Sequence, residues 1–279
     1  MQNVNPTQHQ QQKQQIAAGF SRAAATYDQA GPPLFTYFGQ RLVELARLPE
    51  HAHVLDVAAG RGAVLFPAAE QVGAGGSVVG IDLAENMVET TQEEIQRRQL
   101  AQASMYVMDA EHLTFPSASF DVVCCGFGLF FFPHLEHALR ECARVLKPGG
   151  SIAISTWGTT DERWLWYGDL LKSSPLNWEA APWFTYQTLN NADALRAALA
   201  SAGFTQLAIV EEQREFVYAS EEEWWAAQWS HGMRHLLETL PPSDLARFQS
   251  DAFHRLQAIK QPDGFPLLCR VLFTIGHKP

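Results

Sequence analysis

Two spacings of hydrophobic residues alternate through the middle of the chain. Short apolar runs typical of buried strands are followed by longer stretches in which apolar side chains return every three or four residues, as on one face of a helix. Strands that alternate with helices at this interval predict a mainly parallel sheet with helices on both faces. The strand-like runs are 53–58, 76–83, 103–110, 120–128 and 151–158, and the helix-like stretches are 63–73, 84–100 and 135–146.

The segment before this repeat has a different composition. Residues 1–15 are rich in glutamine and nearly free of hydrophobic side chains, so we expect them to form a disordered tail. Residues 16–48 have a helical pattern that Pro32 and Pro33 divide into two helices. We expect these helices to cover one side of the sheet.

The segment after the repeat is less regular. Residues 159–190 are rich in tryptophan, and residues 220–262 are mainly helical in pattern. Strand-like runs at 205–218 and 266–279 belong to the sheet. We interpret the chain as one domain, 16–279. In this domain, 159–190 and 220–262 are insertions that form a lid over the substrate site.

Composition and charge exclude several classes of protein. The 279 residues carry a formal net charge of −10 and a pI near 5.4, which disfavours binding to nucleic acid or to anionic lipid. No apolar run approaches the roughly 20 residues that span a bilayer, and the N-terminus lacks a signal-peptide layout. The four cysteines have no metal-ligand spacing. We expect a cytoplasmic protein without a metal or a membrane span, and leave open whether it forms a homodimer.

A glycine-rich loop with an acid at its mouth is the main functional signal. The segment VLDVAAGRG places Asp56 at the end of a strand, followed by Gly60 and Gly62, which let a ligand approach the backbone closely. A carboxylate here would repel the diphosphate of a nicotinamide or flavin dinucleotide. It suits the positively charged ammonium and sulfonium groups of S-adenosylmethionine, which has no phosphate.

Two further acids end the next two strands. Asp82 stands where a carboxylate can accept both ribose hydroxyls, and Asp109 stands where it can accept the adenine amino group. Each of these residues alone can be an ordinary helix cap or turn residue. Together with Asp56 they place acids at three consecutive strand ends, which is a much more specific pattern.

Four segments carry a family resemblance: VLDVAAGRG, VVGIDLAENMV, MDAEHLTFPSASFDVV and ALRECARVLKPGG, which lie between Val54 and Thr156. They resemble the class I S-adenosylmethionine-dependent methyltransferases, nearest the ubiquinone/menaquinone-biosynthesis or type 11 small-molecule branch. The resemblance implies an α/β fold with a Rossmann-like, doubly wound, mostly parallel sheet of seven strands. It also implies the strand order 3-2-1-4-5-7-6 with the seventh strand antiparallel, and S-adenosylmethionine as cofactor.

The resemblance also implies which residues bind the cofactor. Ala58 stands where the family usually has a glycine, and because its methyl group restricts positive φ we expect an ordinary backbone conformation there. Tyr27 matches a tyrosine on the N-terminal helices that close over the cofactor, although it can equally be a packing residue. The implied cofactor-binding residues are Tyr27, Asp56, Ala58, Gly60, Gly62, Asp82, Leu83, Met87, Asp109, Ala110 and Phe127.

Candidate catalytic groups are few. Transfer of a methyl group from a sulfonium is a direct displacement that positioning and exclusion of water can promote, so a base is not obligatory. The candidate general bases are His231, among tryptophans, and His134, which follows a phenylalanine-rich segment. Either histidine can instead be a structural residue.

The surplus of aromatic residues predicts an apolar substrate pocket. The chain has 17 Phe and 8 Trp, more than the core alone is expected to need, although many of them must be core residues. The predicted substrate is a small hydrophobic or aromatic metabolite, such as a quinol, phenol, indole, or polyketide- or terpenoid-like molecule, methylated on O, C or N. Candidate pocket residues are Phe127, Phe131, Trp157, Trp183 and Trp229.

Other uses of the same site stay open at this point. The chain can be a sensor that binds S-adenosylmethionine without transferring its methyl group. It can also be an enzyme that uses the bound sulfonium electrostatically in a cyclisation or elimination. A dinucleotide-dependent oxidoreductase is disfavoured by Asp56.

Overall fold

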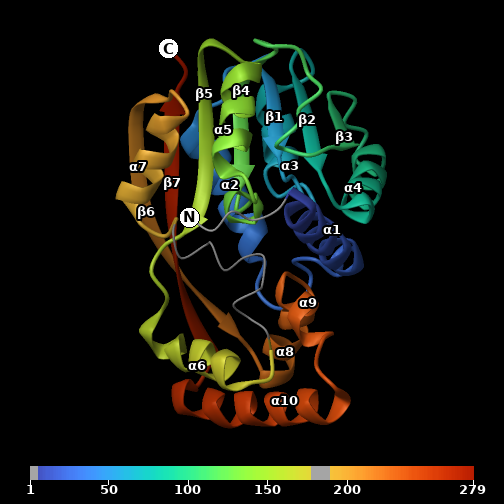
Figure 1. The fold of residues 1–279 in the computed structure, drawn as a ribbon, viewed down its shortest axis with the longest axis vertical. Helices are drawn as coiled ribbons and strands as arrows, with labels where there is room; N and C mark the ends of the chain where they lie inside the picture. Colours follow the sequence, from blue (N-terminus) through green and yellow to red (C-terminus); the bar gives the residue numbers. More distant parts are fainter. Residues whose placement is uncertain (1–5, 177–188) are drawn as a thin grey trace.

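The computed structural model describes residues 6–176 and 189–279. Within these residues, seven strands form one sheet in the order β3-β2-β1-β4-β5-β7-β6 (Figure 1). The first five strands are parallel, and β7 is antiparallel to both β5 and β6, so the predicted strand order and directions are confirmed. The strands are β1 (His53–Val57), β2 (Ser77–Asp82), β3 (Ala103–Val107), β4 (Phe120–Gly126), β5 (Leu146–Trp157), β6 (Thr205–Tyr218) and β7 (Phe265–His277).

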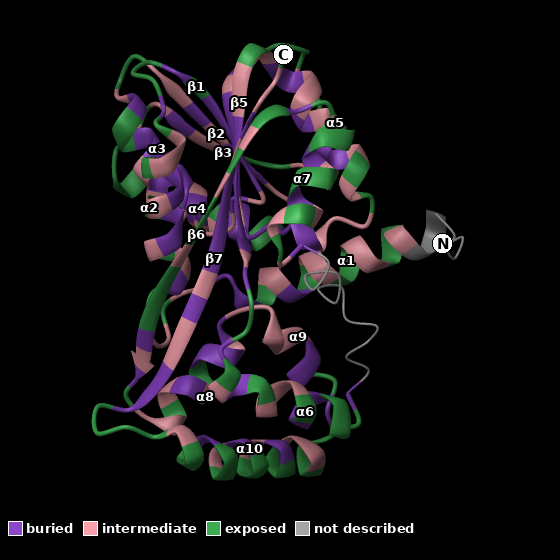
Figure 2. Ribbon diagram, turned by 90° about the vertical axis from the view of Figure 1, so that its left-hand side faces the viewer, coloured by how far each residue is buried: buried purple, intermediate pink, exposed green. Residues whose placement is uncertain are grey.

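Helices cover both faces of the sheet. One layer contains α2 (Leu34–Ala46), α3 (Leu65–Val72) and α4 (Glu85–Arg97), and the other contains α5 (Leu135–Val145) and α7 (Ala192–Ser201) (Figure 2). Val54, Leu55 and Val57 of β1 are fully buried because both layers cover the central strands. This burial explains why the strand-like runs in the sequence are continuously apolar instead of alternating.

The described parts of the two predicted insertions lie together beyond the ends of β6 and β7 (Figure 1). Their described helices, which we call the lid unit, have a hydrophobic core separate from that of the sheet. The segment 220–262, expected to be mainly helical, contains three α-helices. The lid unit consists of α6 (Leu165–Ser173), α8 (Glu221–Trp229), α9 (Met233–Leu237) and α10 (Pro242–Leu256), with short 3-10 helices at Glu162–Trp164 and Gln257–Ile259.

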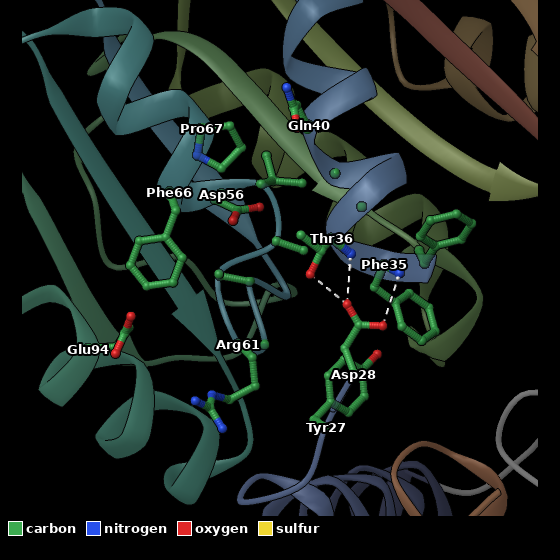
Figure 3. A pocket seen from close by; sticks show the side chains of 18 of the residues that line it. Tyr27, Asp28, Phe35, Thr36, Gln40, Asp56, Arg61, Phe66, Pro67 and Glu94 are labelled. Carbon is green, nitrogen blue, oxygen red and sulfur yellow. Dashed lines mark hydrogen bonds between the residues drawn. The ribbon is translucent and has the colours of Figure 1, made fainter. Parts of the chain in front are cut away.

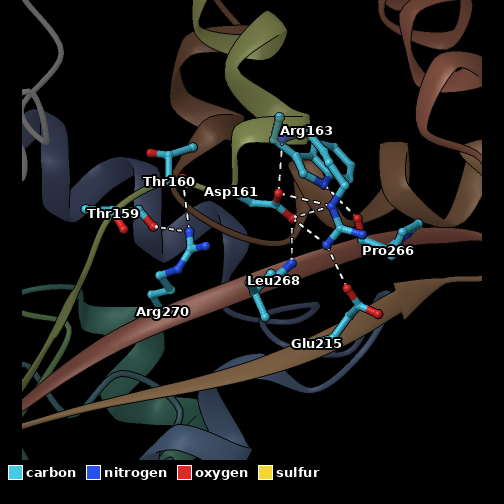
Figure 4. Close-up of polar contacts among 9 residues, drawn as sticks. Thr159, Thr160, Asp161, Arg163, Glu215, Pro266, Leu268 and Arg270 are labelled. Carbon is cyan, nitrogen blue, oxygen red and sulfur yellow. Dashed lines mark hydrogen bonds and ion pairs between the residues drawn. The ribbon is translucent and has the colours of Figure 1, made fainter.

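A polar network around the buried Asp161 fixes the start of the lid unit to the antiparallel pair of β6 and β7 (Figure 4). The carboxylate of Asp161 accepts hydrogen bonds from the Leu268 amide at 2.8 Å and from the Arg163 guanidinium at 2.8 Å. Arg163 also pairs with Glu215 of β6 at 2.7 Å. Burial alone would raise the pKa of Asp161, but Arg163 holds this pKa below its ordinary value. The ionised carboxylate therefore anchors this side of the lid unit.

The expectation of a disordered tail over residues 1–15 is wrong for the part that the structure describes. Helix α1 extends from Pro6 to Ala23, so it includes residues 6–15. Glutamine is a good helix former, and Lys13 forms ion pairs with the folded domain, a tertiary contact that composition does not reveal. Within the described part of the chain, α1 and the other helices all lack the combination of length and apolar character required to cross a bilayer.

Candidate active site

The three acids predicted from consecutive strands meet at one edge of the sheet. Asp56 lies in β1, Asp82 ends β2, and Asp109 follows β3 by two residues. Because β3, β2 and β1 are neighbouring parallel strands, their carboxyl ends meet at the same edge. This edge is where ligands bind in open α/β sheets.

A cavity of about 460 Å³ lies beside the carboxyl end of β1 (Figure 3). Residues of the glycine loop form one wall, and the start of α2 forms another. The structure therefore brings six of the predicted cofactor-binding residues together around one space, namely Tyr27, Asp56, Ala58, Gly60, Gly62 and Phe127. The other five predicted residues do not line this cavity: they are Asp82, Leu83, Met87, Asp109 and Ala110.

The side chain of Asp56 is buried and lacks hydrogen-bond partners. The residue is 1% exposed, and neither carboxylate oxygen has a partner among the described residues. Burial raises the pKa of Asp56 well above its usual range, and the negative charge of Asp82 raises it further. A buried carboxylate in this state is stabilised by a cationic ligand.

Asp82 orients the glycine loop as well as ending β2. Its Oδ2 accepts a hydrogen bond from the Gly60 amide at 2.8 Å, and its Oδ1 accepts one from the Ala84 amide at 2.9 Å. Burial raises the pKa of Asp82, and these amides lower it in part. Each carboxylate oxygen has a further lone pair, so both can still accept hydroxyl groups.

The expectation of an ordinary backbone conformation at Ala58 is wrong. Its φ is 56°, in the left-handed region, which costs an L-residue about 1–2 kcal/mol. The loop is held there by hydrogen bonds from the Ala59 amide to the Ile81 carbonyl at 2.9 Å and from the Gly62 amide to the Ala59 carbonyl at 2.8 Å. Gly128 makes room for the Ala58 methyl group, because a Cβ at position 128 would lie 2.7 Å from it.

Phe127, directly after β4, also has a strained backbone conformation. Its φ is 55°, which is rare for an aromatic residue, and its amide donates to the Ser155 carbonyl at 3.0 Å. Its ring lies 4.3 Å from the ring of Trp157, measured between centroids. Strained residues that the surrounding structure maintains tend to occur at functional sites, and Ala58 and Phe127 both line the cavity.

Asp109 already has a cationic partner. Its Oδ2 lies 2.8 Å from Nζ of Lys13, which also lies 2.5 Å from Glu111. Burial alone would raise the pKa of Asp109, but Lys13 and the Glu111 amide bring it below its ordinary value.

Nearby, Met87 is buried with Ala84 against Ala24, which follows α1.

An aromatic cluster surrounds Phe35 of α2, which sequence reasoning did not single out. The centroid of its ring lies 5.2 Å from that of Tyr27, in a stacked arrangement, and 5.9 Å from that of Trp157. The rings of Phe127 and His231 lie 5.5 and 6.4 Å from it. The structure thus places the predicted residues Phe127, Trp157 and His231 in one cluster.

The remaining predicted pocket residues and the other candidate base lie elsewhere. The ring centroid of Phe131 lies 5.0 Å from that of Phe20 of α1. Trp229 packs beside Trp225 in the lid unit, whose core also contains Trp164 and Trp224. These tryptophans therefore stabilise the lid unit instead of forming walls around Phe127, and Trp183 lies outside the described residues.

His134 lies apart from the aromatic cluster, next to α1. The centroid of its ring is 4.1 Å from that of His9. Its backbone amide donates to Glu111 at 2.9 Å. Among the described residues, His231 has a ring contact with the cluster around Phe35, whereas the ring of His134 contacts His9.

Sequence reasoning missed the polar residues of the cavity other than Asp56 and Tyr27, among them Asp28 and Arg61. Asp28 accepts hydrogen bonds from the Phe35 amide at 3.2 Å and from the Thr36 amide at 2.8 Å, so it caps α2 (Figure 3). Arg61 donates to the Ala24 carbonyl, while its Nε is buried and without a partner in the described part of the chain. Asp28 directly follows Tyr27, and Arg61 lies between two loop glycines, so proximity to singled-out residues was the available signal.

Comparison with known proteins identifies the family. A family model described as a methyltransferase domain matches residues 55–154. The chain is 42% identical over 144 residues to aklanonic acid methyltransferase from Streptomyces sp. (strain C5), and this match covers 52% of this chain and 66% of that protein. It is 34% identical over 251 residues to nocamycin O-methyltransferase from Saccharothrix syringae, covering 86% of this chain and 90% of that protein. The chain belongs to the class I S-adenosylmethionine-dependent methyltransferases.

The fold of this methyltransferase also resembles solved structures. Phosphoethanolamine N-methyltransferase 2 from Haemonchus contortus, in complex with S-adenosyl-L-methionine, matches with a TM-score of 0.55 and 19% identity. The match covers 87% of this chain and 52% of that one, and it concerns the fold alone.

The methyltransferase has S-adenosylmethionine as its cofactor, and the site fits this group. The partnerless carboxylate of Asp56 faces a cavity next to a loop whose Gly60 has open space where a side chain would be. A cation that carries an ammonium group compensates this buried charge, whereas a diphosphate would be repelled. The orphaned acid is therefore explained by the cofactor's charge.

Proposed function

We propose that this methyltransferase transfers the methyl group of S-adenosylmethionine to an oxygen atom of a small, largely apolar metabolite of the polyketide or quinol type. The observation that carries the proposal is the aromatic cluster around Phe35, which adjoins the Asp56 cavity because Phe35 and Phe127 belong to both. Apolar pockets with few polar groups bind flat hydrophobic molecules. Oxygen is favoured because nocamycin O-methyltransferase matches 86% of this chain.

We assign the cofactor's parts to residues by charge and position. Asp56 would hold the methionine ammonium, Asp82 the ribose hydroxyls and Asp109 the adenine amino group, as hydrogen-bond acceptors. Arg61 lines the same cavity and supplies positive charge for the cofactor's carboxylate. When bound, the cofactor supplies the electrophilic methyl group, and the chain's residues position the acceptor and exclude water from it.

We assign the role of general base to His231. Burial lowers the pKa of His231 to about 4, so its imidazole is neutral at physiological pH and has a free lone pair for a hydroxyl proton, although the same burial makes it a weaker base than an ordinary histidine. His231 lies two residues before α9, so the lid unit positions this base beside the aromatic cluster. Phenols and enols that bind in their ionised form would depend less on His231.

A turnover screen tests the proposed function. The protein would be incubated with S-adenosylmethionine and a panel of lipophilic phenols, quinols and enolic polyketides, with S-adenosylhomocysteine and the methylated product measured by mass spectrometry. We expect product in step with S-adenosylhomocysteine. Tight binding of S-adenosylmethionine without S-adenosylhomocysteine from any acceptor would favour a sensor or an electrostatic cyclase instead.

The role of His231 gives a specific prediction. His231→Asn should lower kcat for a substrate hydroxyl by about 100-fold or more, the usual contribution of a general base, while the affinity for S-adenosylhomocysteine stays unchanged. His134→Asn is the matched control and should retain the wild-type rate. Because His231 is neutral above pH 4, the wild-type rate should not fall through this group between pH 8 and pH 5. Equal loss in both variants would contradict the assignment.

A further inference from the structure

Helix α1 is attached at its N-terminal half to the edge of the sheet where adenine is expected. Nζ of Lys13 lies 2.5 Å from Glu111 and 2.8 Å from Asp109. The Glu111 side chain is only 1% exposed, so losing Lys13 would leave a buried carboxylate without its counter-charge. Glu111 is therefore a fixed anchor for α1.

The C-terminal half of α1 covers the expected nucleoside site. Asn86 of α4 donates from its backbone amide to Ser21 Oγ at 3.4 Å and from its side chain to the Ser21 carbonyl at 3.2 Å. Phe20 packs on the small apolar cluster that contains Met87. A nucleoside held by Asp82 and Asp109 would therefore meet this face of α1.

The C-terminal end of α1 is attached to the lid unit. Arg22 pairs with Glu238, which directly follows α9, at 2.6 Å, and Arg234 of α9 pairs with the same carboxylate at 2.7 Å. Arg234 also donates to the Arg22 carbonyl at 2.8 Å. At Gly19 the two helices approach closely, because a Cβ there would lie 3.2 Å from Cβ of His235.

We propose that α1 couples the cofactor site to the lid unit, so that a bound nucleoside stabilises α9, and His231 next to it, over the aromatic cluster. The inference rests on the proposed cofactor site. Lys13 and Arg22 are nine residues apart on one helix, or about 14 Å, so a change at one end reaches the other through a rigid element. Lys13 has two partners, so Glu111 and Asp109 both keep α1 docked while Asp109 also accepts the adenine amino group.

Such coupling requires contacts that differ between the free and the bound state. In the free protein the Asp109 Oδ2 is bonded to Lys13 and its Oδ1 accepts the Glu111 amide. With the nucleoside bound, Asp109 gains the adenine amino group, and Phe20 gains apolar contact with the nucleoside. These added contacts hold α1 more firmly and, through Glu238, hold α9 as well.

Hydrogen exchange with S-adenosylhomocysteine as the probe tests the coupling. In the wild type, we expect the ligand to slow amide exchange at least about threefold in both α1 and α9. In Glu238→Gln, α1 should still respond while the response of α9 is lost, with affinity for S-adenosylhomocysteine reduced less than about threefold. Arg247→Gln is the matched control, since it removes an exposed pair with Asp244 on α10 and should leave the wild-type response.

The other end of α1 is tested with Lys13. Lys13→Met should speed exchange in α1 and α9 without ligand and weaken S-adenosylhomocysteine binding five- to tenfold, whereas Lys13→Arg, which keeps the cation, should restore both. If S-adenosylhomocysteine binds the wild type but α9 exchange is unchanged or faster, the coupling is refuted and the proposed function stands. If calorimetry shows that the wild type does not bind S-adenosylhomocysteine, the proposed function is refuted, and the coupling with it.

Discussion

Asp56→Asn is expected to weaken S-adenosylhomocysteine binding by at least about 30-fold. The substitution removes the buried charge that the cofactor's ammonium would neutralise, and losing one partner of such a pair costs about 2–5 kcal/mol. Asparagine has nearly the same size as aspartate, so the cavity keeps its shape. Isothermal titration calorimetry with S-adenosylhomocysteine would measure the change, and an unchanged Kd would rule out the role of Asp56.

The same substitution should alter how stability depends on pH. The pKa of Asp56 is raised in the folded protein, whereas in the unfolded chain it is about 3.9. Between these two values the folded state binds the extra proton, so the wild-type free energy of unfolding falls as pH rises, by up to about 1.4 kcal/mol per pH unit. Asp56→Asn removes this loss, and its stability relative to the wild type should therefore increase from pH 4 upward.

Asp121→Asn is the control with the opposite sign. Asp121 accepts from Lys147 at 2.7 Å and from the His53 amide at 2.8 Å. Burial would raise the pKa of Asp121, but Lys147 brings it below its ordinary value. This variant should be less stable than the wild type at neutral pH, and the difference should disappear as pH falls below 4. Parallel pH curves for the two variants in thermal unfolding would contradict the assignment at Asp56.

Gly39→Ala is expected to destabilise the fold by about 1–3 kcal/mol, although alanine favours a helix by about 1 kcal/mol. Gly39 lies where α2 crosses the loop before α3, and a Cβ there would lie 2.3 Å from the Ala63 carbonyl oxygen. Backbone atoms cannot rotate aside as a side chain can, so α2 must shift. Because Phe35 and Thr36 belong to the same helix, binding of S-adenosylhomocysteine should weaken as well.

Gly168→Ala provides the matched control for this prediction. Gly168 is also inside a helix, α6, but a Cβ there would meet nothing within 4 Å. The substitution should raise the free energy of unfolding by about 0.5–1 kcal/mol, through the helix preference of alanine alone. Urea unfolding would compare the two variants, and wild-type stability of Gly39→Ala would show that α2 is not held against the loop.

The sheet and the acid edge could be predicted from the sequence because both follow from local patterns. Apolar runs and helical spacing define the elements, and parallel strands bring their carboxyl ends to one edge whatever the connecting loops contain. Asp56, Asp82 and Asp109 therefore reach the same edge by strand position alone. The division into one domain with two insertions stays a prediction.

The errors of sequence reasoning concern contacts between residues far apart in the chain. Residues 6–15 look disordered by composition, yet Lys13 reaches Asp109 and Glu111, nearly a hundred positions away. Ala58 has a positive φ that a hydrogen bond from Ala59 to the carbonyl of distant Ile81 helps to hold, and distant Gly128 leaves space for its methyl group. Such contacts leave no periodic signal in the sequence.

The sequence by itself determined the order of elements, the buried faces of the strands and the acids at their ends, because hydrophobic spacing and strand direction act over short distances. Only the tertiary structure decided how side chains meet across elements. It placed His231 and not His134 beside Phe35, gathered Trp164, Trp224 and Trp225 into a separate core, and joined α1 to α9. Each of these results depends on the packing of segments distant in the chain, which residue patterns do not encode.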